Sequence, residues 1–123
     1  MILVDTSVWI DHLRQHDATL ANLLDAGQVV AHPCVIGELA LGNLKHRDRV
    51  LDALQGLPQA SAVSDRELLY FVTHHKLAGL GIGYVDAHLL ASARLGHLTV
   101  WTRDKRFHDV ASRLDLAAHL PGQ

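Results

Sequence analysis

Short apolar runs alternate with longer segments in which apolar residues recur at helical spacing. The run Ile2-Leu3-Val4 has no polar alternation, which is typical of a strand buried on both faces of a sheet. Further strands are predicted at 28–31 and 97–102, with weaker ones at 60–63 and 116–118. Helical periodicity and capping residues predict helices that open at Thr6-Ser7 and then cover 17–27, 33–44, 48–54, 65–77, 85–95 and 107–114.

Strands that alternate with helices favour an α/β sandwich built on a parallel sheet. In such folds, ligands bind beyond the carboxyl ends of the strands. Asp5 and Asp104 both lie just past the carboxyl end of a predicted strand. We therefore expect chemistry at this edge of the sheet.

Four acidic residues occupy surroundings that are costly for a charge. Asp5 closes an apolar run and Asp104 follows a β-prone one, while Glu38 and Asp86 interrupt apolar helical segments. A carboxylate against apolar surface loses several kcal/mol of hydration unless a cation or hydrogen-bond donors replace the water. No Lys or Arg lies within three residues of Asp5, Glu38 or Asp86 along the chain. The simplest compensating cation is a hard divalent metal ion, Mg²⁺ or Mn²⁺, which prefers oxygen ligands.

Each acid also has a plainer interpretation. Asp5 and Asp86 could cap helices, and Asp104 could pair with one of its basic neighbours. Glu38 could be a partly exposed residue at a helix margin, although its neighbours on the same face are apolar or small. The joint pattern favours a site, because independent caps need not converge on one edge of one sheet.

Composition sets the class of protein. With 49% hydrophobic and 20% charged residues, the chain has an ordinary globular composition. A single cysteine, Cys34, cannot form an internal disulfide, so we expect a reducing cytoplasm as the compartment. Residues 1–12 carry no basic region of the signal-peptide type, and no apolar run approaches the roughly 20 residues of a membrane span.

The net charge of −2 argues against a protein that grips nucleic acid by bulk positive charge alone. Two local basic clusters remain available, at 45–49 and at 103–106. Solvated helix surface is the plainer interpretation of both.

The four acids and the residues around them resemble a known family. The segments that carry the resemblance are Ile2-Leu3-Val4-Asp5-Thr6-Ser7-Val8-Trp9, the stretch 35–42 around Glu38, Tyr84-Val85-Asp86-Ala87, and Trp101-Thr102-Arg103-Asp104. Together they look like a PIN-domain ribonuclease and, more narrowly, a VapC toxin of a type II toxin–antitoxin system. The resemblance covers nearly the whole chain, and all four acids occur in the order that the family has.

The resemblance implies a single PIN-like domain over 1–123, a three-layer α/β/α sandwich with a mostly parallel central sheet. It implies a Mg²⁺- or Mn²⁺-dependent endoribonuclease whose products carry a 5′-phosphate and a 3′-hydroxyl. By position in the family, the acids that hold the metal and catalyse would be Asp5, Glu38, Asp86 and Asp104. Thr6, Ser7 and Thr102 would be polar residues that support them. Clustered carboxylates agree with this assignment, because they repel one another unless divalent ions share them.

The resemblance also implies partners: an RNA substrate, a VapB-like antitoxin that covers the acid cleft, and a second copy of the chain in a homodimer. Apolar residues around Leu39, Leu41 and Leu44, and around Leu51 and Leu54, are candidates for antitoxin or dimer contact. Ordinary burial in the core is the alternative for most of them.

Two other functions remain open from the sequence. The first is a PIN-fold module that binds RNA or protein without cutting, although such a module could lose acids that this chain keeps. The second is a small α/β phosphohydrolase. The haloacid-dehalogenase type needs an acid two residues after the first Asp, where this chain has Ser7.

Overall fold

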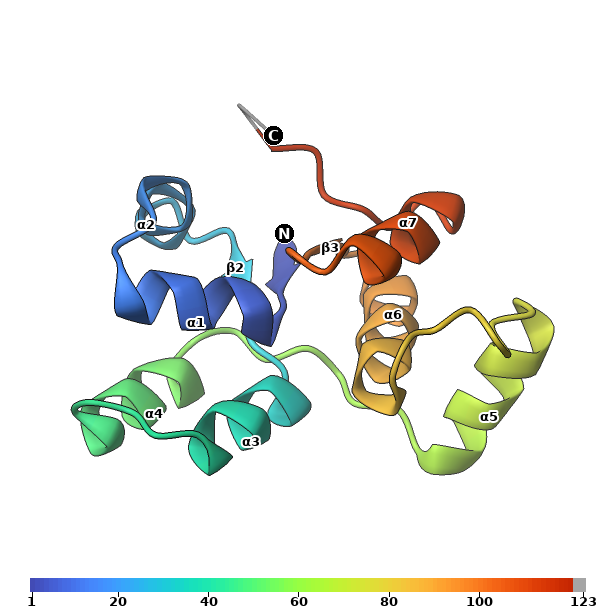
Figure 1. The fold of residues 1–123 in the computed structure, drawn as a ribbon, viewed down its shortest axis with the longest axis horizontal. Helices are drawn as coiled ribbons and strands as arrows, with labels where there is room; N and C mark the ends of the chain where they lie inside the picture. The colour runs from blue at the N-terminus through green and yellow to red at the C-terminus, as the bar shows by residue number, and fades with distance from the viewer. Residues whose placement is uncertain (121–123) are drawn as a thin grey trace.

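A three-stranded parallel sheet lies at the centre of the computed structural model, which describes residues 1–120 (Figure 1). The strand order is β2-β1-β3, with β1 (Ile2–Val4) between β2 (Val29–Val30) and β3 (Thr99–Trp101). Leu3 pairs with Val30 on one side and with Val100 on the other. The carboxyl ends of all three strands therefore lie at the same edge of the sheet.

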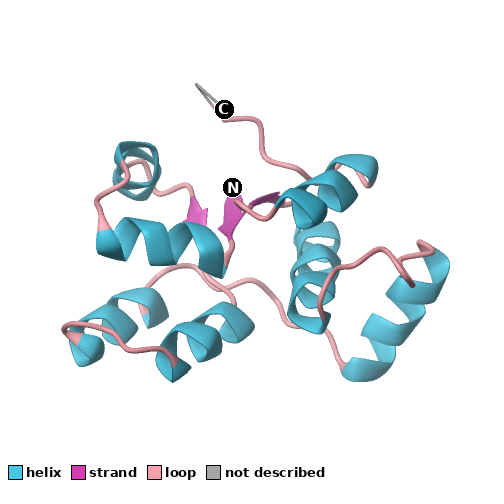
Figure 2. Ribbon diagram, in the orientation of Figure 1, coloured by secondary structure: helices cyan, strands magenta, loops and turns pink. Residues whose placement is uncertain are grey.

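The helices and strands alternate as the sequence predicts, and the helices surround the sheet (Figure 2). The helices within residues 1–120 are α1 (Thr6–Arg14), α2 (Ala18–Asp25), α3 (Pro33–Leu41), α4 (Arg47–Gln55), α5 (Asp65–His74), α6 (Tyr84–Gly96) and α7 (Lys105–Arg113). None of them is long and apolar enough to cross a membrane.

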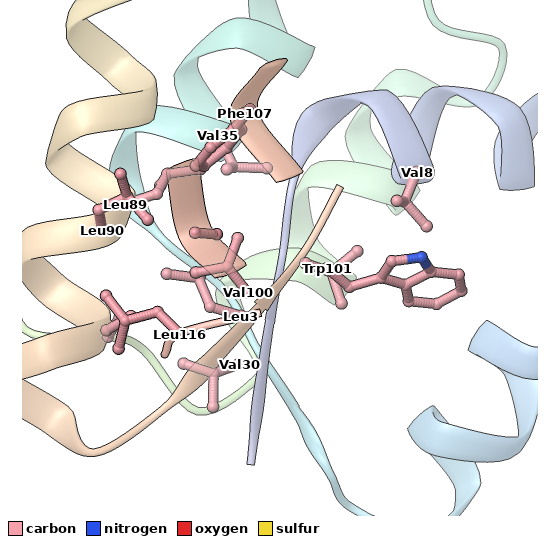
Figure 3. Close-up of a cluster of buried hydrophobic side chains, with 14 of the residues drawn as sticks. Leu3, Val8, Val30, Val35, Leu89, Leu90, Val100, Trp101, Phe107 and Leu116 are labelled. Carbon is pink, nitrogen blue, oxygen red and sulfur yellow. The ribbon is translucent and has the colours of Figure 1, made fainter. Parts of the chain in front are cut away.

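Apolar side chains cover both faces of the sheet, which gives three layers. Leu3 and Val100 pair across the strands and lie with Leu89 of α6, whereas Trp101 projects to the other side, toward Val8 of α1 (Figure 3). Side chains alternate between the faces of a strand, so neighbours such as Val100 and Trp101 enter opposite halves of the core. Each of these side chains is at least 95% buried, as a strand run without polar alternation requires.

The two weak strands were predicted wrongly. Residues 60–63 and 116–118 form no strand; only isolated bridges occur there, at Gln59 just before the first segment and at Ala117 within the second. In the first case Gln59 pairs with Ala31, and the chain then leaves the sheet because Ser64 caps the next helix. In the second case Ala117 bridges Val100. Single bridges extend the sheet edges without adding strands.

The end of α6 also differs from the prediction. The sequence predicts a helix that ends at residue 95, but Gly96 is the last helical residue and His97 takes the left-handed conformation, with φ 54°. The Leu98 N–H donates to the Ala93 carbonyl at 2.8 Å. This closing bond requires a left-handed residue immediately before Leu98, and histidine can adopt that conformation at modest cost.

Candidate active site

Asp5 stands at the carboxyl end of β1 and is 6% exposed. It occupies the position before α1, yet its side chain caps no helical N–H. Its Oδ2 instead accepts hydrogen bonds from Ser7 Oγ at 2.8 Å and from Thr102 Oγ1 at 2.7 Å. Asp5 is therefore not a plain helix cap, and its carboxylate is oriented by two hydroxyl groups from different elements.

Asp104 follows β3 and begins α7. Its Oδ1 accepts the Phe107 N–H at 3.0 Å, so it caps the helix, and its own N–H donates to Thr102 Oγ1 at 3.1 Å. The alternative in which Asp104 pairs with a basic neighbour is wrong. Arg103 bonds to Asp11 and Asp17, and Lys105 bonds to an aspartate of its own helix.

Glu38 is presented by α3, and its Oε1 accepts the Thr6 hydroxyl at 2.7 Å. The sequence predicts a carboxylate against an apolar face, but Glu38 is exposed and Leu41 on the same side is 92% exposed. The helix buries Val35 and Leu39. Glu38 lies beside that buried stripe, because each helical residue turns by about 100° from the one before.

Asp86 lies in the first turn of α6, where its Oδ2 accepts the Gly83 N–H at 3.0 Å. Burial raises the pKa of this carboxyl, the bond from Gly83 opposes the rise, and the charges of Asp5, Asp104 and Glu38 raise it further. Like charges shift a pKa in this way only when they are near. Hydrogen bonds through Thr6 and Thr102 connect the surroundings of Asp5, Glu38 and Asp104, and Asp86 lies near enough for their charges to raise its pKa.

The chemistry of these donors fits a hard divalent cation. None of the four carboxylates belongs to an ion pair with Lys or Arg within residues 1–120. The negative charges of the other three acids raise the pKa of Asp86, and a cation shared among the four carboxylates would offset this repulsion. Over the same residues, however, no three His, Cys, Asp or Glu side chains already stand close enough to hold an ion. Both observations hold, because Coulomb repulsion acts over longer distances than coordination bonds do.

A groove adjoins the acids on the side of Glu38. It has a volume of about 580 Å³ and lies between α1, α3 and the loop that leads to α4. Its lining is mostly apolar, with three basic side chains among it: Arg14, Lys45 and His46. Arg14 and Lys45 take part in no ion pair within the described residues. The sequence analysis singled out the basic cluster at 45–49, which includes Lys45 and His46. It did not predict that Arg14 lies in the same groove, because Arg14 is distant from that cluster along the chain.

A buried histidine that the sequence analysis missed joins two of the elements that carry acids. His32 is fully buried before α3; its Nδ1 accepts the Cys34 N–H at 3.0 Å, and its Nε2 lies 2.9 Å from Ser92 Oγ in α6. Because Nδ1 accepts, the ring proton resides on Nε2 and is donated to Ser92. Burial, with a smaller effect of His88, lowers the pKa of His32 to about 4. Its place before Pro33, at a predicted helix start, was the available sequence signal.

Comparison with known proteins identifies the family of this chain. The family model described as "PIN domain" matches residues 2–113, and the chain therefore belongs to the PIN domain family. Among curated proteins, Ribonuclease VapC32 from Mycobacterium tuberculosis, strains CDC 1551 / Oshkosh and H37Rv, is 54% identical over 107 residues, which cover 86% of each chain.

Solved structures support the fold. FitAcB from Neisseria gonorrhoeae superposes with a TM-score of 0.65 at 25% identity, over 95% of both chains. PAE2754 from Pyrobaculum aerophilum gives a TM-score of 0.60 at 15% identity, over 89% of this chain and 83% of that one. The predictions of an α/β PIN-like fold and of a VapC-type family member are confirmed.

Proposed function

We propose that this protein is a metal-dependent endoribonuclease toxin that hydrolyses RNA phosphodiester bonds at the four-acid site. The observation that carries the proposal is the placement of the acids, because Thr102 Oγ1 contacts both the Asp5 carboxylate and the Asp104 N–H, while Thr6, next to Asp5, bonds to Glu38. The raised pKa of Asp86, which arises in part from the other three acids, agrees with this placement. The 54% identity to Ribonuclease VapC32 supports RNA as the substrate. Metal dependence is supported by the charge of the site, which holds four acids and no paired cation within residues 1–120.

In this proposal Asp5, Glu38, Asp86 and Asp104 hold one or two Mg²⁺ or Mn²⁺ ions. When bound, such an ion activates a water and neutralises charge that develops on the phosphate. Two of the acids have their orientation set by hydroxyl groups. Ser7 and Thr102 direct the Asp5 carboxylate, and Thr6 directs that of Glu38.

RNA would approach the acids along the groove beside Glu38. Arg14 and Lys45 line this groove and are free of ion pairs within residues 1–120, so they are available to phosphate oxygens. These local cations supply an attraction that the net charge of −2 does not. The mostly apolar floor of the groove suits the face of an unpaired base.

We further propose a VapB-like antitoxin that silences the toxin by covering the acids, a homodimer, and a cytoplasmic location. An antitoxin that delivered an Arg or Lys to the four acids would replace the charge of the metal. Of the leucines singled out in the sequence, Leu39 and Leu54 belong to the core, while Leu41 is 92% exposed. Leu41 is therefore the one best placed for contact with a partner.

The proposal is tested by mapping RNA ends in cells after induced expression of the toxin. The wild-type chain should produce new 5′-phosphate ends at defined positions, and co-expression of the antitoxin should suppress them. Asp5→Asn is the comparison, because asparagine keeps a hydrogen-bond acceptor for Ser7 and Thr102. The same ends in cells that express Asp5→Asn would refute the assignment of the site.

A further inference from the structure

Arg103 connects the loop after β3 with two helices. Its Nε lies 3.0 Å from Asp11 Oδ2 of α1, and its Nη2 donates to Asp17 Oδ2 at the start of α2. The guanidinium also lies over the Trp101 ring, 5.5 Å from the ring centre. We call these three contacts the Arg103 anchor.

The backbone of Arg103 reaches the acids through Ser7. Its N–H donates to Ser7 Oγ at 3.0 Å, and Ser7 Oγ lies 2.8 Å from Asp5 Oδ2. A backbone N–H can only donate, so Ser7 must accept at this contact. The single hydroxyl proton of Ser7 is then directed to the Asp5 carboxylate, and the orientation of Ser7 depends on the position of the Arg103 N–H.

The anchor also explains why a cation next to Asp104 leaves the acids unpaired. The guanidinium is taken up by Asp11 and Asp17, and it forms no ion pair with any of the four acids within residues 1–120. Exposed ion pairs are individually weak, but two carboxylates and an aromatic face on one planar guanidinium act as a network. The anchor adds to the two bonds that also hold the loop between β3 and α7, from the Asp104 N–H to Thr102 Oγ1 and from the Phe107 N–H to Asp104 Oδ1.

We propose that Arg103 is a positioning residue for the four-acid site, acting through its own backbone N–H and the Ser7 hydroxyl on Asp5. The inference rests on the proposed ribonuclease function for its effect on rate, while the anchor itself is a property of the fold. Arg103 then needs no contact with RNA. Its importance lies in a hydrogen bond that its side chain holds in place.

The first test weakens the anchor at Asp11, whose carboxylate bonds to Arg103 and to no other side chain within residues 1–120. Asp11→Asn should lower kcat for cleavage of a single-stranded RNA about tenfold and leave KM within about twofold, because orientation and not binding is lost. The matched control is Asp109→Asn, which breaks a surface ion pair with Lys105 and should leave both constants unchanged. A rise in KM with kcat unchanged would mean that the region contacts RNA, and would overturn the proposal.

The second test is a double-mutant cycle with Ser7→Ala. Arg103→Ala should lower kcat in the wild-type background and cause no further loss in the Ser7→Ala background, since the effect passes through Ser7. Additive losses would overturn the proposal. Arg103→Lys should restore part of the rate, because one ammonium can hold one of the two carboxylates.

A third readout does not depend on activity. Hydrogen exchange of the Arg103 amide, followed by NMR in the metal-free protein, should be at least about tenfold faster in Asp11→Asn than in wild type or Asp109→Asn. Unchanged exchange would refute the anchor. If the wild-type protein cleaves no RNA, the proposed function fails, and this exchange measurement still decides whether Arg103 positions Ser7.

Discussion

The Asp5 carboxylate accepts hydrogen bonds from two hydroxyl groups that are far apart in the sequence. Ser7 follows it on α1, and Thr102 lies 97 residues away at the end of β3. Thr102 also accepts the Asp104 N–H, so one hydroxyl orients two of the four acids. At the scale of residues, Asp5 and Thr102 define the site more firmly than the exposed Glu38 does.

Thr102→Val removes this shared hydroxyl while keeping the shape of the side chain. The Asp104 N–H loses its acceptor and Asp5 loses a donor, so the free energy of unfolding should fall by about 1–2 kcal/mol. RNA cleavage should fall with it. Thr102→Ser keeps the hydroxyl and should retain most of both, as measured by urea unfolding and by initial cleavage rates. Equal losses in the two variants would contradict this role for the hydroxyl.

Asp86→Asn should stabilise the metal-free protein. The pKa of Asp86 is raised in the folded state, so the folded protein holds this proton more tightly than the unfolded chain does. Stability is therefore lost as the pH rises above the ordinary carboxyl pKa of 3.8 and through the raised value. At pH 7 the variant should show a Tm a few degrees above wild type, and it should be inactive.

The gain in Tm from Asp86→Asn should vanish as the pH falls toward 3.8, the ordinary carboxyl pKa, because Asp86 is then protonated in the wild-type protein. Asp25→Asn, at an exposed acid at the end of α2, is the control and should change little at any pH. A lower Tm for Asp86→Asn at pH 7 would contradict the repulsion inferred at the site.

At the scale of elements, α3 and α6 carry Glu38 and Asp86 to the strand ends, and a buried bond between His32 and Ser92 joins these two helices. His32 also caps α3 through the Cys34 N–H. The placement of two acids therefore depends on a histidine that must remain neutral. Charging this ring would protonate Nδ1 and cost the fold the hydrogen bond from the Cys34 N–H, whereas Nε2 could still donate to Ser92.

His32 predicts a loss of stability in mild acid. Its pKa is about 4 in the folded protein and 6.5 as a reference value, so the unfolded chain takes up a proton first as the pH falls. The free energy of unfolding should decrease by about 1 kcal/mol for each pH unit below 6.5 until the pH nears 4. Denaturant unfolding at a series of pH values measures this slope.

His32→Asn is the comparison for that slope. Asparagine can still cap α3 but does not titrate, so the variant should lose less stability per pH unit over the same range. The other histidines remain in both proteins, and the difference between the slopes isolates His32. Identical slopes would contradict the neutral buried state of His32.

At the scale of the whole molecule, the sequence predicts the sheet edge well and the contacts between distant segments poorly. Asp5 and Asp104 could be placed because each follows a strand, and parallel strands share a carboxyl edge. The environment of Glu38 was predicted wrongly, since the apolar residues near it do not show which side of α3 faces the groove. The pairing of Arg103 with Asp11 and Asp17 has no local signal, because about ninety positions separate the partners.

Metal binding should stabilise the whole fold if the four acids hold the ion. Mn²⁺ at a hundred times its dissociation constant should raise the free energy of unfolding by about 2.7 kcal/mol. Thermal unfolding with and without Mn²⁺ measures the shift. The shift should be largely lost in Asp86→Asn and kept in Asp25→Asn, and an equal shift in both variants would place the ion elsewhere.

The central claim is that RNA is cleaved at these four carboxylates with a divalent ion. Its most direct test is the initial rate of cleavage of a single-stranded RNA as Mn²⁺ is titrated into metal-free protein, for the wild-type chain and for Asp5→Asn. We predict no cleavage by wild type in chelator, a rate that rises and saturates with Mn²⁺, and no cleavage by Asp5→Asn at any concentration. Cleavage by wild type without metal, or comparable cleavage by Asp5→Asn, would contradict the claim. RNA binding with no cleavage at any Mn²⁺ concentration would also contradict it and would favour a PIN-fold binding module.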